Sequence, residues 1–199
     1  MSVVNSSIAL IIDCDYIFEG ENYWCFVVNL ENNEPNAEIT GIRGAHQYAL
    51  SNDNVVGVYI FRTKTQFLPN GFSNYFPNIT DYWANQNSML KVITNENFED
   101  IPNLETVTLS RNQIDAIGKS AFDNLNCLTL LNLGNNVCIN KVYETPEDFI
   151  QLPYDIENCA EPELNFTTNA SSTTLSVIDS LNARILELEE ALGNCLDNQ

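Results

Sequence analysis

Residues 104–136 read LETVTLSRNQIDAIGKSAFDNLNCLTLLNLGNN, and the pattern L-x-x-L-x-L-x-x-N occurs in them twice. The positions of the two copies, 24 residues apart, are Leu104, Val107, Leu109 and Asn112, then Leu128, Leu131, Leu133 and Asn136. The apolar positions face a narrow core, and each asparagine closes the turn after a short strand by bonding backbone groups of its own and neighbouring units. One such unit cannot bury its apolar face alone, so we expect further units on either side.

The same spacing extends upstream, where Val55, Val58 and Ile60 precede Thr63 in the asparagine position. Ile79, Tyr82 and Ala84 form the next set, followed by Asn87. The units start near residues 55, 79, 104 and 128, and the pairs expected to fill their far side are Phe72 with Phe76, Phe98 with Ile101, and Phe122 with Leu125. The pattern is that of leucine-rich repeats. We predict an α/β fold, a short leucine-rich repeat solenoid over residues 55–137 with a parallel β-sheet on its concave face.

The composition excludes several classes of partner. The chain of 199 residues has 27 acidic and 8 basic side chains, a formal net charge of −19. Such a charge repels nucleic acids and anionic membranes, and no apolar run reaches transmembrane length. The sequence also has no glycine-rich phosphate loop and no zinc-ligand spacing, and His46 is its only histidine. We therefore expect no cofactor, no metal, no membrane span and no enzymatic activity.

The cysteines indicate disulfide-bonded caps at both ends of the repeats. Residues 13–30 read as a β-hairpin that brings Cys14 near Cys25, within an N-terminal cap and lead-in strand over residues 1–54. A short helix pinned by a Cys138–Cys159 disulfide is expected as the C-terminal cap over residues 138–160. We interpret Cys127 as a small buried thiol.

The same cysteines favour an oxidising, extracellular location. Four glycosylation sequons agree with it, at Asn5, Asn78, Asn165 and Asn169. The first twelve residues do not resemble a signal peptide. We therefore expect either a truncated gene start or a Met1 that is internal to a longer precursor.

The end of the chain has a different pattern. Residues 161–174 are rich in Pro, Ser, Thr and Asn and are expected to be a linker. Residues 175–197 then place apolar side chains at alternating spacings of three and four, at Ile178, Leu181, Ile185, Leu188, Leu192 and Cys195. These are heptad positions of a short coiled coil that would form a homo- or heterodimer, with Cys195 available for an interchain disulfide. The alternative is an amphipathic helix folded back on the repeats.

A candidate binding surface follows from strand alternation. Side chains between the core positions point out of the concave sheet, and neighbouring strands lie about 4.8 Å apart. We therefore expect Tyr59, Phe61 and Trp83 to form an exposed aromatic patch with Arg62 and Arg111 beside it. Aromatic residues and arginine anchor protein interfaces. The alternative is that Tyr59 and Phe61 pack under the N-terminal cap.

Several segments resemble the secreted leucine-rich repeat proteins of insects, particularly flies and midges. They are the hairpin around Cys14 and Cys25, ITGIRGAHQYALSNDNVVGVYI at 39–60, FPNI at 76–79 and GNNVCINKVYE at 134–144. The caps and the cysteine-containing coiled coil also resemble the mosquito leucine-rich immune proteins. Members of that group pair through disulfides and coiled coils and hold a complement-like thioester protein.

These features lead to two hypotheses about function. The first is a secreted, non-enzymatic protein–protein recognition module with an innate-immune role, which binds through the concave face and dimerises through the tail. The second is a structural glycoprotein of the extracellular matrix or of a secretory fluid, without a specific binding site.

Overall fold

The computed structural model describes residues 8–35 and 37–162, which all belong to the first of two compact units, Met1–Pro162. The predicted linker, the heptad helix with Cys195, and the sequons at Asn5, Asn165 and Asn169 lie outside the described residues. Within the described ranges no helix combines the length and the apolar content of a membrane span.

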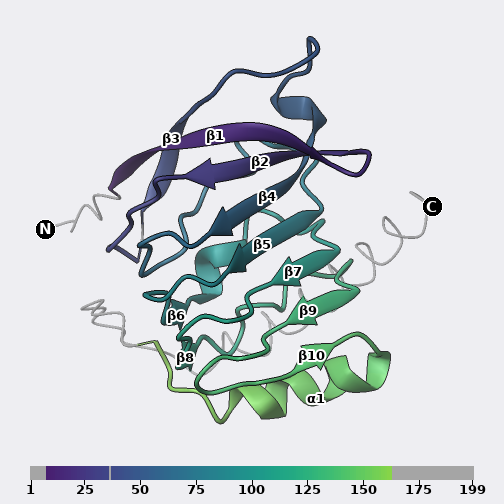
Figure 1. Cartoon of the computed structure of the whole chain (residues 1–199). Helices are drawn as coiled ribbons and strands as arrows, with labels where there is room; N and C mark the ends of the chain where they lie inside the picture. The colour runs from purple at the N-terminus through teal and green to yellow at the C-terminus, as the bar shows by residue number, and fades with distance from the viewer. Residues whose placement is uncertain (1–7, 36, 163–199) are drawn as a thin grey trace, which may run out of the picture. The chain divides into compact units, whose positions relative to one another are not determined.

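An eight-stranded sheet dominates the described part, in the order β10-β9-β7-β5-β4-β2-β1-β3 (Figure 1). Its strands are β1 (Ala9–Glu19), β2 (Asn22–Val28), β3 (Glu38–Arg43), β4 (Val55–Phe61), β5 (Asp81–Asn85), β7 (Thr106–Thr108), β9 (Leu130–Asn132) and β10 (Val142–Tyr143). The run from β2 through β4, β5 and β7 to β9 is parallel. The predicted repeat solenoid with a parallel sheet is therefore confirmed.

The register of the parallel strands stacks the repeats on one core. Val58, Tyr82, Val107 and Leu131 are consecutive partners across β4, β5, β7 and β9, and each is 0% exposed. Because side chains alternate along a strand, the residues on either side of each of these four point to the opposite, concave face.

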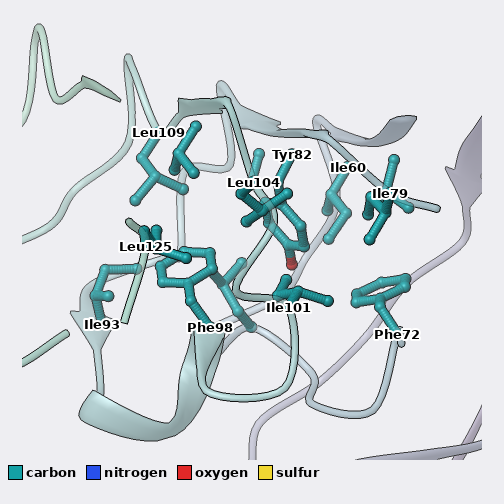
Figure 2. Close-up of a cluster of buried hydrophobic side chains, with 14 of the residues drawn as sticks. Ile60, Phe72, Ile79, Tyr82, Ile93, Phe98, Ile101, Leu104, Leu109 and Leu125 are labelled. Atoms are coloured by element: carbon teal, nitrogen blue, oxygen red, sulfur yellow. The ribbon is translucent and has the colours of Figure 1, made fainter. Parts of the chain in front are cut away.

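The convex side is filled by the expected aromatic residues, all of which are buried. Tyr82 points from its strand into the core, where its ring meets Phe72 and Phe98 edge-on, with centroids 5.6 and 5.4 Å apart (Figure 2). A 3-10 helix, Asn95–Phe98, and a second sheet of β6 (Val92–Ile93) and β8 (Ala116–Ile117) complete this side.

An asparagine ladder joins successive repeats. Oδ1 of Asn87 accepts hydrogen bonds from the backbone N–H and Oγ1 of Thr63, at 2.8 and 2.9 Å. Oδ1 of Asn112 accepts from the N–H of Asn87 at 2.7 Å, and Oδ1 of Asn136 accepts from the N–H of Asn112 at 3.2 Å. Each side-chain amide also donates to main-chain carbonyls. Buried backbone groups at the turns are thereby satisfied, which fixes the spacing of the coils.

The N-terminal hairpin of β1 and β2 extends the sheet beyond the first repeat. Cys14 and Cys25 form the predicted disulfide, with Cα atoms 5.1 Å apart. The sequence predicted a lead-in strand within residues 1–54, before the first repeat. The strand exists as β3, but it pairs with β1 at the outer edge of the sheet, so the chain returns through residues 44–54, including the 3-10 helix Asn52–Asn54, before β4 begins.

The C-terminal side closes with β10, which is antiparallel to β9, and helix α1 (Pro146–Ile156). Thr145 caps the helix by accepting from the N–H of Asp148 at 3.2 Å. Cys138 and Cys159 form the predicted disulfide. The interpretation of Cys127 as a small buried thiol was wrong, because Cys127 is partly exposed and disulfide-bonded. Spacing alone did not reveal this bond.

Candidate binding face

The concave face carries one continuous row of side chains across five strands. Phe26, Tyr59, Trp83, Thr108 and Asn132 are consecutive partners on β2, β4, β5, β7 and β9. The row is aromatic at its N-terminal end and polar at its C-terminal end.

Five aromatic side chains on this face form what we call the aromatic patch: Trp24, Phe26, Tyr59, Phe61 and Trp83. Tyr59 lies 5.6 Å from Trp83 and 5.3 Å from Phe61 between ring centroids, and Phe26 lies 5.2 Å from Tyr59. Trp24 and Trp83 meet edge-to-face at 4.6 Å. The structure thus brings the three predicted aromatic residues together, each half-buried.

The sequence reasoning missed Trp24 and Phe26. The alternative, in which Tyr59 and Phe61 pack under the cap, does not describe their position, because β2 lies beside β4 in the same sheet and Phe26 shares their face. The alternation of side chains along β2 could have revealed them. Tyr23, Cys25 and Val27 are buried in the core, so the residues between them, Trp24 and Phe26, point to the concave face.

Trp24 is seated on Gly57, its strand partner. A Cβ at position 57 would meet the indole ring at contact distances no real structure tolerates. The indole nitrogens of Trp24 and Trp83 are buried and have no hydrogen-bond partner among the described residues. The two tryptophans are therefore held by ring packing.

The two predicted arginines occupy equivalent backbone positions just after their strands. The residue before each ladder position is left-handed, with φ of 53° at Arg62, 58° at Gln86, 57° at Arg111 and 58° at Asn135. Arg62 lies over the ring of Phe61 at 4.7 Å and donates to Oε1 of Gln86 at 3.0 and 3.2 Å. Arg111 is exposed and lies away from the aromatic patch, beside the polar half of the face.

A polar hollow of about 460 Å³ opens on that half. Residues of β5, β7, β9 and β10 and of the turns after them line it, including Gln86, Arg111, Asn132, Asn140 and Lys141. Tyr59 forms its boundary with the aromatic patch. Burial raises the pKa of Tyr59, an effect partly offset by its hydrogen bond with Asn85 and by the charge of Arg62, so the phenol stays protonated at neutral pH.

Other residues singled out in the sequence lie elsewhere. His46 is part of the N-terminal cap, where its ring stacks on Tyr16 at 3.9 Å and its nitrogens contact Tyr23 and Asn52. The sequon residue Asn78 is exposed, and its Nδ2 donates to the carbonyl of Asp53 at 2.8 Å. The described residues contain no cluster of three or more potential metal ligands.

The match to a known family agrees with the repeat fold. Residues 85–137 match the family model described as leucine rich repeat. No protein with a curated description matches the sequence. One similar solved structure is described as the Toll–Spatzle complex, a molecular hub in Drosophila development and innate immunity; the match has 20% identity and a TM-score of 0.40. The match covers 63% of this chain and 21% of that chain, so the similarity spans about a fifth of the length of that protein.

Proposed function

We propose that this chain is a secreted, non-enzymatic recognition module that binds a protein partner through the concave face of its repeats. The observation that carries the proposal is the aromatic patch, with Arg62 against its edge. Half-buried aromatic rings in mutual contact present a large area that loses little conformational freedom on binding, and such residues dominate interface energetics. A partner would therefore gain most of its affinity at Tyr59, Phe61 and Trp83.

Two features support secretion. The disulfides Cys14–Cys25 and Cys138–Cys159 persist in oxidising compartments. Asn78 is an exposed sequon residue, and the proposal includes a glycan there. An innate-immune role follows only from the resemblance to the insect proteins and belongs to the same proposal.

The aromatic patch is tested by affinity capture from extracellular fluid, followed by titration of the captured protein. Trp83→Ala should weaken its binding by about 1–3 kcal/mol without unfolding the chain. Tyr154→Ala is the matched control, because Tyr154 is 63% exposed on α1, outside the concave face. Equal affinities of wild type and Trp83→Ala would contradict the proposal. If neither wild type nor the variant captures a partner that binds saturably, the second hypothesis, a structural glycoprotein, is favoured.

Dimerisation through residues 175–197 is a separate proposal. Sedimentation and non-reducing gels of wild type and Cys195→Ser test it. A disulfide-linked dimer that disappears in Cys195→Ser is the expected result. A monomer in which peptide mapping joins Cys195 to Cys127 of the same chain would exclude the interchain bond.

A further inference from the structure

We infer that the polar hollow binds a single carboxylate side chain presented by the protein partner. The inference rests on the proposed function and specifies the chemistry of the partner. Its basis is that three side-chain amides and one guanidinium on the wall of the hollow have donor groups without a partner among the described residues.

Internal hydrogen bonds fix the direction of the amides. Oδ1 of Asn132 accepts from the N–H of Gly134 at 2.9 Å, and Oδ1 of Asn140 accepts from the N–H of Asn135 at 2.6 Å. A backbone N–H can only donate, so each side-chain oxygen must face it and each NH₂ group is left over. Neither NH₂ group has a hydrogen-bond partner among the described residues.

Gln86 behaves in the same way, because its Oε1 is occupied by Arg62. Its NH₂ group is also without a partner in the described part of the chain. Three amides on the wall of the hollow therefore have an NH₂ group without a partner in the described part of the chain, while each amide oxygen already accepts a hydrogen bond. A ligand with several acceptor lone pairs satisfies these NH₂ groups, and a ligand with donors alone does not.

The charges point the same way. Arg111 has no ion pair within residues 8–35 and 37–162, although acidic residues outnumber basic ones by 27 to 8 in the sequence. None of the residues that line the hollow is acidic. Lys141 contributes less charge, because Asp148 and Asp155 lie 3.5 and 3.3 Å from its Nζ. A guanidinium with free donors beside neutral amides is suited to the two oxygens of a carboxylate.

The net charge of the chain limits what kind of partner presents this group. At −19 the chain repels a strongly acidic protein and attracts a basic one. The partner chemistry that fits both facts is a neutral or basic surface with one Asp or Glu, placed beside the apolar group that covers the aromatic patch. The hollow would then fix the register of the complex.

The test uses capped Gly-Asp-Gly and Gly-Asn-Gly peptides, whose only difference is the carboxylate. In ¹H–¹⁵N spectra of the full chain, the Asp peptide should shift the side-chain amides of Gln86, Asn132 and Asn140 saturably, and the Asn peptide should not. Arg111→Gln should lower the affinity for the Asp peptide by at least about 10-fold. Glutamine is tolerated there, because Gln86 has the same left-handed backbone at the equivalent position.

Lys91→Gln is the matched control, since it removes the same charge from an exposed residue that does not line the hollow. An equal loss of affinity in both variants, or equal shifts with both peptides, would overturn the inference. Inorganic phosphate that moves these amides as strongly as the Asp peptide would also overturn the assignment to a carboxylate. Trp83 does not line the hollow, so this test and that of the aromatic patch fail independently.

Discussion

The two halves of the concave face share one backbone and differ in almost everything else. Tyr59 and Trp83 are partners in the same row as Thr108 and Asn132. On the N-terminal half the rings contact one another closely and cover Gly57, whereas on the C-terminal half the side chains are short, polar and arranged around an open hollow. The scaffold therefore does not determine the surface that it carries.

The repeats are held together by the buried inward residues and by the asparagine ladder. The side chains that point out of the concave face take part in neither. Val107 and Leu131 are fully buried beneath the polar half, as Val58 and Tyr82 are beneath the aromatic half. Outward residues are free of that packing constraint and can be selected for binding.

Loss of a ladder residue should destabilise both halves together and have the largest effect. Asn112→Ala removes the acceptor of the Asn87 N–H and the donor to two main-chain carbonyls at 2.7 and 2.8 Å, all of them buried. We expect a loss of about 3–4 kcal/mol in the free energy of unfolding, measured by chemical denaturation. Asn103→Ala, at an exposed position, should change it by less than about 0.5 kcal/mol. Similar values for the two variants would contradict the role of the ladder.

A larger side chain at position 57 should affect the aromatic half of the concave face and leave the polar half unchanged. Gly57→Ala places a Cβ against the ring of Trp24 and should cost about 1–3 kcal/mol, with displacement of Trp24 and weaker partner binding. Thr106→Val is the control, because Thr106 occupies the corresponding register position on the open half. It should leave stability within about 0.5 kcal/mol of wild type. Tryptophan fluorescence and denaturation measure both effects, and an unchanged spectrum in Gly57→Ala would show that Trp24 is not packed there.

Two buried tyrosines should respond oppositely to loss of the hydroxyl. Tyr143, next to the polar half, donates to Oδ2 of Asp155 at 2.9 Å, so Tyr143→Phe should cost about 1–2 kcal/mol. The hydroxyl of Tyr82, beneath the aromatic half, is buried without a hydrogen-bond partner among the described residues, so Tyr82→Phe should be neutral or stabilise by up to about 1 kcal/mol. Denaturation curves of the two variants compare them directly. A cost for Tyr82→Phe equal to that for Tyr143→Phe would point to a partner for the Tyr82 hydroxyl.

Acid should weaken the capping of helix α1, and this is the smallest of the expected effects. Hydrogen bonds from the side chain and backbone of Thr145 lower the pKa of Asp148 below its ordinary value of 3.8. Because the folded-state pKa is depressed, its contribution is present above pH 3.8 and is lost as the pH falls through the folded-state value. The stability difference between wild type and Asp148→Asn should therefore be constant above about pH 5, decrease as the pH falls below 3.8, and be lost below the folded-state pKa of Asp148. A difference that grows on acidification would contradict this sign.

The repeats were predictable because their inward residues recur at fixed spacing, so that Leu104 and Leu128 set the register for Val55 and Ile79. The hairpin disulfide was predictable for a similar reason, since the turn at residues 19–22 brings Cys14 close to Cys25. Both inferences use contacts that are local or periodic in the sequence.

What the sequence did not reveal depends on non-local geometry. Strand β3 pairs with β1 at the outer edge of the sheet. The sequence of residues 38–42 predicts a strand but does not specify which neighbouring strand it pairs with. Trp24 joins the aromatic patch because β2 pairs with β4. The donor character of the hollow depends on the orientation of Asn132 and Asn140, which the turns after β9 determine.

The most direct test of the central claim is hydroxyl-radical footprinting of the chain with and without its captured partner. We predict protection of Tyr59 and Phe61 on the concave face, while Tyr48 and Tyr154, which are exposed elsewhere, keep their reactivity. Protection of Tyr48 or Tyr154 with unchanged reactivity at Tyr59 and Phe61 would contradict the claim that the concave face is the binding surface.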